Sequence, residues 1–365
     1  MRRSPSSGKI GTAWRHLVGG HPRRVLNAGL VVLQKRLRPL HAFAMPSHYG
    51  IEVTNLCHGG CRLCPVGEGR QSRPLGCMSW EHFCDVLSQV ENYATLICLY
   101  AWGEPFEHPR AYDMIRHVKD RGIYAKVSTN THPFRPEDAE RLVASGLDEL
   151  AVSLHGVSEQ TYRSYQPQHS LADVIEKTRS IVAAKERLKS STPAIHFNFI
   201  VLRQNEHEIE DLRRLAASLK VDYQLVQTSL HLRLLPYDRQ MNLRGVGEEE
   251  LRCERIQRIR EWLPQDDRLL LPGYQYIREH DGRLPPPGWQ PGCPMPWYLT
   301  VISWNGDVNL CSGIYDCRHR VGNVFETPLK AIWNNDLYQA ARKALRDGQS
   351  GDTPMLCGQC GGILL

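Results

Sequence analysis

A chain of 365 residues, 41% of them hydrophobic and 23% charged, has the size and composition of a protein that buries a substantial core. No apolar run approaches the roughly 18 residues of a membrane helix, so we do not expect the chain to span a bilayer. Its 12 cysteines come without a signal-peptide pattern, and the chain is too long for a small secreted disulfide scaffold. We therefore expect reduced thiols, many of them ligands, in a cytoplasmic protein.

The excess positive charge, +6 overall, lies at the N-terminus. Residues 1–50 contain nine Lys or Arg and no acidic residue, whereas the rest of the chain holds 36 basic and 39 acidic residues. A body with a slight acidic excess lacks the basic face of a nucleic-acid-binding domain, so we expect no nucleic-acid partner.

Residues 1–45 form a basic N-terminal arm in which 1–20 have the composition of a disordered tail and 23–38 the spacing of a helix. One face of that helix collects four leucines, Leu26, Leu30, Leu33 and Leu37. The spacing predicts a helix packed across the main domain or a second copy of the chain. Two alternatives stay open: contact with an anionic membrane surface or a partner protein, and an Arg-rich organelle transit peptide.

From residue 46 to residue 228 the sequence alternates strand-like and helix-like segments. Strand patterns cover 49–54, 95–100, 123–128, 149–154, 195–202 and 222–226, and helical patterns cover 79–91, 109–121, 136–145, 158–188 and 206–219. Six consecutive units of this kind predict an α/β fold with a parallel sheet covered by helices. They are too few for a closed barrel of eight strands.

Three cysteines follow the first predicted strand, with the spacing Cys57-x3-Cys61-x2-Cys64. Cysteine thiolates hold iron–sulfur cubes, and three of them leave one iron free to bind a small molecule. Gly59 and Gly60 allow the loop to wrap a compact object. A zinc site or a buried cysteine cluster is the alternative, although zinc usually takes two paired motifs.

The run Glu52-Val-Thr-Asn-Leu-Cys57 followed by x3-C-x2-C resembles the cluster loop of the radical S-adenosylmethionine (SAM) superfamily. The resemblance implies a [4Fe–4S] cluster on Cys57, Cys61 and Cys64, whose open iron binds SAM. It also implies a partial (β/α)6 TIM-like barrel and an external electron donor such as a ferredoxin or flavodoxin. One electron then cleaves SAM to a 5′-deoxyadenosyl radical, which takes a hydrogen atom from the substrate.

Polar motifs follow the next three strands, where ligands gather in parallel α/β folds. Ala101-Trp102-Gly103-Glu104-Pro105 resembles the family's GGEP motif with Trp102 in place of a glycine. Ser128-Thr129-Asn130 and Ser153-Leu154-His155-Gly156 follow the third and fourth strands. The resemblance implies SAM contacts from eight residues: Leu63, Gly103, Glu104, Pro105, Ser128, Asn130, Ser153 and Arg163.

His155 stands where relatives carry Asp, close to the predicted site. It is a candidate proton acceptor if the substrate is an alcohol. A lone histidine is more often a hydrogen-bonded core or surface residue, and that interpretation stays open.

Five further cysteines lie between residue 293 and the C-terminus. An alternating run around Asn305-Gly306 predicts a β-hairpin, a helical pattern covers 329–345, and Cys357-Gly-Gln-Cys360 follows. On the residues alone, a structural zinc with four sulfur ligands competes with an iron–sulfur cluster.

Hairpin, helix and CxxC together resemble the SPASM/twitch extension of radical SAM enzymes, and the cysteine count suits the one-cluster twitch form. The resemblance implies an auxiliary [4Fe–4S] cluster on Cys293, Cys311, Cys357 and Cys360, with Cys317 as a spare. The C-terminal domain is thus placed at 293–365, after a connector at 229–292 in which 248–262 is helical. The cysteines at 77, 84, 98 and 253 have no ligand spacing and are interpreted as ordinary thiols.

The predicted enzyme is a radical SAM oxidoreductase that acts on a small, hydroxyl-rich molecule of the sugar or aminocyclitol kind. Hydrogen abstraction from an alcohol carbon leaves a radical that becomes a ketone by losing one proton and one electron, and the auxiliary cluster can take that electron. Oxidation, dehydration and epimerisation are all within this chemistry. Two alternatives are a maturase of ribosomal peptides or proteins, and a non-enzymatic protein that binds zinc at both cysteine sets.

Overall fold

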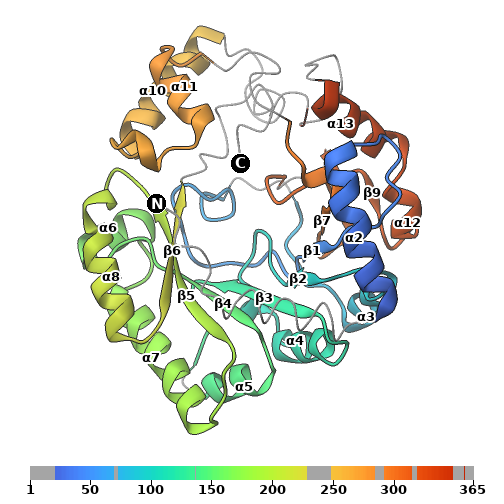
Figure 1. Cartoon of the computed structure of the whole chain (residues 1–365). Helices are drawn as coiled ribbons and strands as arrows, with labels where there is room; N and C mark the ends of the chain where they lie inside the picture. Colours follow the sequence, from blue (N-terminus) through green and yellow to red (C-terminus); the bar gives the residue numbers. More distant parts are fainter. Residues whose placement is uncertain are drawn as a thin grey trace.

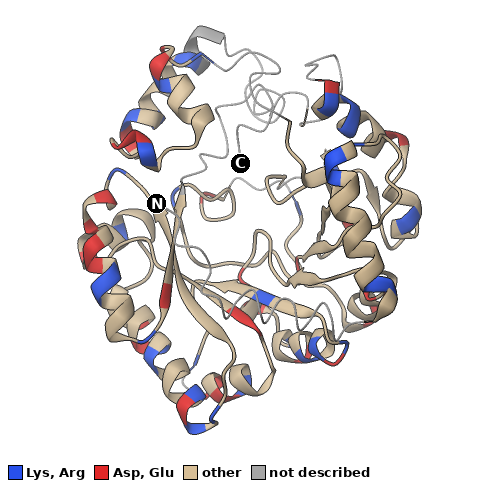
Figure 2. Ribbon diagram, in the orientation of Figure 1, with Lys and Arg blue, Asp and Glu red and all other residues tan. Residues whose placement is uncertain are grey.

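The structure is a computed structural model that describes residues 21–69, 73–135, 137–227, 248–283, 292–314, 319–347 and 357. In this part of the chain one sheet runs in the order β6-β5-β4-β3-β2-β1-β7-β8-β9. Helices cover its outer side (Figure 1). Most of the charged residues, drawn in blue and red in Figure 2, lie on these outer helices.

The strands are short, and most follow the predicted segments closely. They are β1 (His48–Ile51), β2 (Leu96–Cys98), β3 (Tyr124–Thr129), β4 (Glu149–Ser153), β5 (Ala194–Val201), β6 (Asp222–Gln227), β7 (Leu299–Ile302), β8 (Asp307–Asn309) and β9 (Gly322–Asn323).

In the described part of the chain one α-helix precedes β1, others alternate with β1 to β6, two lie between β6 and β7, and two follow β9. They are α2 (Pro22–Leu37), α3 (Trp80–Val90), α4 (Ala111–Lys119), α5 (Asp138–Ala144), α6 (Glu159–Tyr165), α7 (Leu171–Arg187), α8 (Ile209–Ser218), α10 (Glu248–Trp262), α11 (Pro272–Glu279), α12 (Leu329–Ile332) and α13 (Asp336–Asp347). Short 3₁₀ helices are η1 (Pro105–Glu107), η2 (Glu206–Glu208), η4 (Asp267–Leu269) and η5 (Met295–Trp297).

Strands β1 to β6 pair in parallel, each with its neighbour along the chain. Because β6 and β9 are the two ends of the sheet, the barrel is open, which confirms the predicted α/β partial-barrel fold. Strand β7 pairs in parallel with β1, and β8 and β9 follow antiparallel. The predicted hairpin at Asn305-Gly306 is confirmed, and Gly306 takes the left-handed conformation (φ 85°) that favours glycine. The C-terminal hairpin therefore continues the sheet beside the strand that leads into the cysteine loop.

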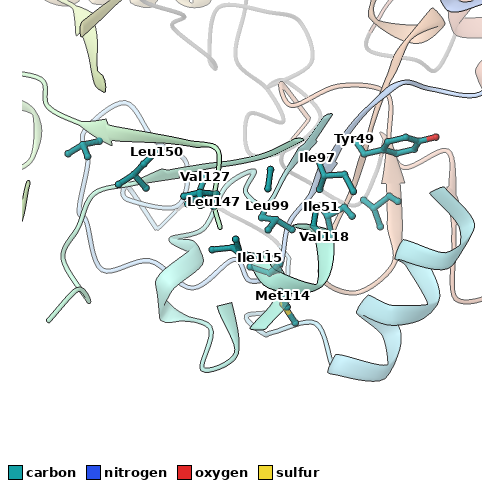
Figure 3. Close-up of a cluster of buried hydrophobic side chains, with 14 of the residues drawn as sticks. Tyr49, Ile51, Ile97, Leu99, Met114, Ile115, Val118, Val127, Leu147 and Leu150 are labelled. Atoms are coloured by element: carbon teal, nitrogen blue, oxygen red, sulfur yellow. The ribbon is translucent and has the colours of Figure 1, made fainter. Parts of the chain in front are cut away.

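The core lies between the sheet and the helices, as Figure 3 shows for β1 to β4 and α4. Ile51, Ile97 and Val127 from the strands are fully buried against Met114 and other apolar residues of α4. Each such side chain contributes about 1.5–3 kcal/mol when it leaves water. This packing sets the positions of the strand ends, from which the candidate site is built.

The predicted helix over 158–188 is wrong in its middle, because two helices occupy this stretch. Helix α6 ends at Tyr165, and α7 begins after Ser170, whose side chain accepts a hydrogen bond from the backbone of Asp173. Pro167 lies between them and cannot donate a helical hydrogen bond. The predicted helix over 329–345 is likewise divided into α12 and α13.

Helix α2 lies against the body of the protein as predicted, but with its polar face inward. Arg24, Asn27 and Gln34 are buried, and their side chains bond to backbone atoms of the sheet loops and the C-terminal domain. The leucine face points outward instead. The polar face of α2 is buried because the surface beneath the helix presents backbone carbonyl groups, which need hydrogen-bond donors rather than apolar side chains. Within the described residues, none of the helices has the length and apolar character needed to cross a bilayer.

Candidate active site

The cysteine loop leaves the carboxyl end of β1 and closes around Gly59. The Sγ atoms of Cys57 and Cys61 each lie 3.4 Å from the point where a Cβ would stand on Gly59. The Gly59 amide donates to Cys57 Sγ over 3.4 Å. A Cβ on Gly67 would lie 2.4 Å from the Cys61 carbonyl oxygen, so the return of the loop also needs glycine. The glycines therefore leave a cradle that sulfur atoms line.

Burial shapes the acidity of these thiols. Burial raises the pKa of Cys57 to about 12 and that of Cys61 well above its usual range. The neighbouring Cys64 raises both pKa values further, so the three thiols lie close enough to interact electrostatically. Three mutually close thiolates need a nearby positive charge, and iron would supply it.

The donor set at this loop fits a cluster. It consists of thiols alone, the ligands that iron–sulfur clusters take. Within the described residues, no three His, Cys, Asp or Glu side chains stand at the spacing of a single bound metal ion. The fit therefore rests on three thiols close together and on the glycine cradle that two of their sulfur atoms line.

The end of β3 reaches the cysteine loop through Asn130. The Asn130 Nδ2 donates to Cys57 Sγ over 3.6 Å, and its Oδ1 accepts from the backbone of His132 over 2.8 Å. The amide is thus oriented with its donor toward sulfur. Asn130 was predicted from sequence as a SAM contact, and the structure places it beside a predicted cluster ligand.

The Gly103-Glu104-Pro105 segment packs on the backbone just before Cys57. A Cβ on Gly103 would lie 2.1 Å from the Thr54 carbonyl oxygen, and the Glu104 amide donates to the Leu56 carbonyl over 2.8 Å. Pro105 then begins η1. The tight approach explains the need for glycine and fixes the β2 loop against the cysteine loop.

The Glu104 carboxylate is buried and turns toward β3. It accepts a hydrogen bond from Thr129 Oγ1 over 2.8 Å and another from the backbone N–H of Asn130 over 2.7 Å. Burial raises the pKa of Glu104 to about 7, although these hydrogen bonds oppose the rise. Its side chain therefore braces two strand ends of the site.

Gln166 is a site residue that sequence reasoning missed. It follows α6, where the Tyr165 carbonyl accepts from the Arg62 amide over 3.1 Å. Gln166 is fully buried and close enough to Cys61 to lower the pKa of that thiol against the effect of burial. Its amide nitrogen and oxygen make no hydrogen bond of normal geometry among the described residues. The proline after it was the available signal, because it predicts a break where the chain can turn toward the site.

The remaining predicted SAM contacts occupy varied positions. Leu63 is buried in the core next to the cysteines, and Ser128 and Ser153 stand half-buried at the ends of β3 and β4. Arg163 lies on α6, half exposed, and its Nε donates to Glu159 Oε1 over 2.6 Å. In this arrangement its guanidinium is engaged on the helix surface.

His155 is buried at the end of β4. Its Nδ1 accepts from the Ile200 amide over 3.1 Å, and its ring packs edge-on against Tyr165. Burial lowers its pKa to about 3, so the ring is neutral at physiological pH. A neutral imidazole that accepts at Nδ1 carries its proton on Nε2 and is a hydrogen-bond donor there.

The second cysteine set is partly described: Cys293, Cys311 and Cys357 are placed, while Cys317 and Cys360 lie outside the described residues. Cys311 and Cys357 both raise the pKa of the buried Tyr338, so the two thiols lie near one ring. The Tyr338 hydroxyl bonds to Thr300 of β7 over 2.7 Å. These two thiols therefore lie beside the hairpin, and thiols are the ligands that iron–sulfur clusters take.

A buried cation stands next to this set. Arg342 of α13 is fully buried and lies over the rings of Trp333 and Tyr338. Its guanidinium donates to carbonyl groups that include Leu40 of the N-terminal arm and Pro296 of η5. Burial lowers its pKa to about 10, which leaves it charged at neutral pH. An anionic cluster nearby would offset the cost of burying this charge.

Comparisons with known proteins agree with this geometry. The Radical SAM superfamily model matches residues 51–216, and the SPASM iron–sulfur cluster-binding domain matches residues 293–361. The tungsten-containing aldehyde ferredoxin oxidoreductase cofactor-modifying protein of Pyrococcus furiosus is 30% identical over 50% of this chain, which spans 51% of that relative's length. The mycofactocin maturase MftC of Mycobacterium ulcerans is 24% identical over 88% of this chain and 82% of its own.

A solved structure shares the fold. The Streptococcus suis SuiB structure bound to precursor peptide SuiA covers 87% of this chain and 71% of its own, with a TM-score of 0.58 and 16% identity. Radical SAM enzymes carry a [4Fe–4S] cluster and SAM, and the SPASM domain carries auxiliary iron–sulfur clusters, so both cofactor predictions are confirmed. The chain belongs to the radical SAM superfamily and carries a C-terminal SPASM iron–sulfur cluster-binding domain.

Proposed function

We propose that this enzyme oxidises its substrate by radical hydrogen abstraction, with Cys57, Cys61 and Cys64 holding the SAM-binding cluster. The observation that carries the proposal is the pairing of β7 with β1, in which Tyr49 lies opposite Thr300. It supports a close placement of the two cysteine sets, because Cys57 follows β1, whereas Cys293 precedes β7 and Cys311 follows β8 in the same sheet. When bound, the cluster and SAM supply an electron and a 5′-deoxyadenosyl radical.

The protein's own residues bind and orient these groups. Gly103 and Pro105 hold the β2 loop against the cysteine loop, and Asn130 and Gln166 direct amide groups at two of the three sulfurs. Glu104 braces Thr129 and Asn130 from behind. Leu63, Ser128, Ser153 and Arg163 complete the proposed SAM contacts, and His155 is proposed as a hydrogen-bond donor at the substrate side.

The proposed reaction balances as a two-electron oxidation. The substrate C–H bond breaks, and its hydrogen atom leaves as part of 5′-deoxyadenosine. The substrate radical must then lose one proton and one electron. Cys293, Cys311, Cys357 and Cys360 are proposed to hold an auxiliary cluster, which would accept that electron when bound. An external reductant, of the ferredoxin or flavodoxin class, supplies the electron that SAM cleavage consumes.

For the substrate, we favour a peptide or protein precursor. A relative that matches 88% of this chain and 82% of its own length is a maturase. A small, hydroxyl-rich molecule is the second candidate, because a cluster that accepts one electron suits the oxidation of an alcohol carbon. Both candidates use the same radical step.

Incubation of the anaerobically reconstituted enzyme with SAM and dithionite tests the proposal. We expect 5′-deoxyadenosine, with its formation abolished in Cys57→Ala and retained in Cys253→Ala, which replaces an exposed thiol of α10 outside both proposed ligand sets. Precursor peptides encoded beside the gene and a panel of polyols are then compared for faster 5′-deoxyadenosine formation and a product lighter by two hydrogens. Failure of SAM cleavage in the iron-loaded enzyme would refute the proposal, and acceleration by polyols alone would refute the peptide substrate.

A further inference from the structure

Helix α2 presents an apolar face to solvent. Its exposed side chains include Val25 (40% exposed), Leu26 (65%), Val32 (57%), Leu33 (48%) and Leu37 (62%). Their spacing places them on one side of the helix, opposite the buried Arg24, Asn27, Val31 and Gln34. In an ordinary surface helix the apolar side faces the core and the polar side faces water. Here the arrangement is reversed.

Hydrogen bonds hold α2 in this rotation. The Asn27 side chain both donates to and accepts from the backbone of Met45, each over 3.0 Å. Gln34 does the same with Ala44, over 3.2 and 3.0 Å. Turning the leucines inward would break these pairs and leave buried backbone groups unsatisfied, at about 1–3 kcal/mol each. The outward apolar face is therefore a stable feature of the fold.

Arg24 anchors the N-terminal end of the helix in the same way. Its guanidinium donates to the carbonyl groups of Glu91, Arg121 and Gly122 over 2.8–3.1 Å. These acceptors lie after α3 and α4, so α2 is fastened across the outside of the barrel (Figure 1).

The charge around the apolar face has one sign. Arg23, Lys35 and Arg36 are exposed, and Pro22–Leu37 contains no acidic residue. By helical geometry Arg36 falls among the exposed leucines and valines, with Arg23 at the border of the face. Lys35 lies nearer the buried side, with its Nζ 4.4 Å from the centre of the Tyr298 ring. A second copy docked through this face would bring like charges together without an acidic partner. An anionic lipid bilayer suits both the apolar side chains and the basic ones, because its acyl region accepts apolar groups and its headgroups carry negative charge.

We propose that α2 is an interfacial anchor that lays its outer face on an anionic lipid bilayer. Leucines and valines enter the boundary between headgroups and acyl chains, while the basic side chains reach the lipid phosphates. At 16 residues, about 24 Å long, the helix lies flat on the surface. The barrel then sits on the membrane by a face separate from the described part of the active site.

Vesicle flotation of the full chain tests this anchor. We expect the reconstituted protein to float with vesicles of phosphatidylcholine and phosphatidylglycerol, to remain behind with phosphatidylcholine alone, and to be released by salt. Each of Arg23→Gln and Arg36→Gln should weaken binding about fivefold, from about 1 kcal/mol per cation, whereas Lys35→Gln should change it less because Lys35 packs on Tyr298. Leu26→Ser with Leu33→Ser and Leu37→Ser should weaken it by more than about tenfold.

Two controls make the outcome decisive. Leu188→Ser removes a leucine of similar exposure (47%) at the end of α7, and it should leave flotation unchanged. The replaced α2 side chains are exposed, so circular dichroism and 5′-deoxyadenosine formation should match the wild type in every variant. Equal flotation of the triple-serine variant and the wild type, or no binding to anionic vesicles, would overturn the proposal. So would a wild-type dimer in light scattering that the triple-serine variant lacks, because the face would then be self-associating.

Discussion

The indole nitrogen of Trp102 donates a hydrogen bond to the carbonyl oxygen of Ile314 over 3.1 Å. Trp102 stands in the motif after β2, where the family motif has glycine, and Ile314 closes the turn that begins at Cys311. The Trp102 backbone also donates to the buried Glu52 over 3.2 Å. The ring that departs from the family motif therefore joins the predicted SAM loop to the second cysteine set.

Trp102→Phe keeps an aromatic ring and removes only the N–H. We expect SAM cleavage to continue and substrate oxidation to fall, since the loop of Cys311 loses a bond worth about 1 kcal/mol. The ratio of oxidised product to 5′-deoxyadenosine measures the effect, and Trp80→Phe on α3 is the matched control. A parallel fall of both products would contradict the linking role.

Arg73 and Glu52 form a buried ion pair at the base of the cysteine loop, with N···O distances of 2.6 and 2.8 Å. Arg73 also donates to Ser303 of the C-terminal hairpin over 3.0 Å. Arg73→Met leaves a carboxylate buried without its partner, so we expect a loss of about 3–5 kcal/mol in the free energy of unfolding. Urea denaturation measures this loss.

The control for that pair is Arg187→Met, which breaks the exposed bond of Arg187 to Glu140. Exposed pairs contribute about 0–1 kcal/mol, so this variant should unfold close to the wild type. If both variants lost the same free energy of unfolding, burial would not explain the contribution of the Arg73–Glu52 pair to stability.

Gln166→Leu removes the amide that faces Cys61 while keeping a side chain of similar size. Hydrogen bonds to cluster sulfurs help to set the reduction potential, and donors favour the more negative reduced state. We expect a more negative midpoint potential for the SAM-binding cluster, read by EPR during redox titration. Gln168→Leu, beside Gly60 in the same segment, is the control and should leave the potential unchanged. Identical potentials in both variants would assign Gln166 to packing alone.

Glu104 should make stability depend on pH. Its pKa is raised to about 7 by burial, so folding favours the protonated form. The stability that this proton contributes is complete below the ordinary pKa and is lost as the pH rises through about 7. In Glu104→Gln this loss disappears, and the unfolding free energy of the variant relative to the wild type should rise on the order of 3 kcal/mol across that range.

Urea denaturation of both proteins at a series of pH values provides the measurement. Only the difference between them matters, because buried histidines such as His155 impose the opposite pH dependence on both. A difference that stays flat with pH would contradict the elevated pKa of Glu104.

Local patterns determined much of this protein. The spacing of Cys57, Cys61 and Cys64, the Asn305-Gly306 turn and the six strand–helix units all depend on residues close together in the chain. Backbone conformation and hydrophobic period act over such distances, so the partial barrel and its hairpin extension could be predicted.

Only the tertiary structure decided what each element meets. The leucine spacing correctly predicted a helix near residues 23–38, but the carbonyl groups beneath it reversed the face that is buried. Gln166 reaches Cys61, and Trp102 reaches Ile314, through contacts between segments distant in sequence. The hydrophobic period shows which side chains share a face of a helix. The hydrogen-bonding groups on the surface that this face meets come together only once the chain has folded.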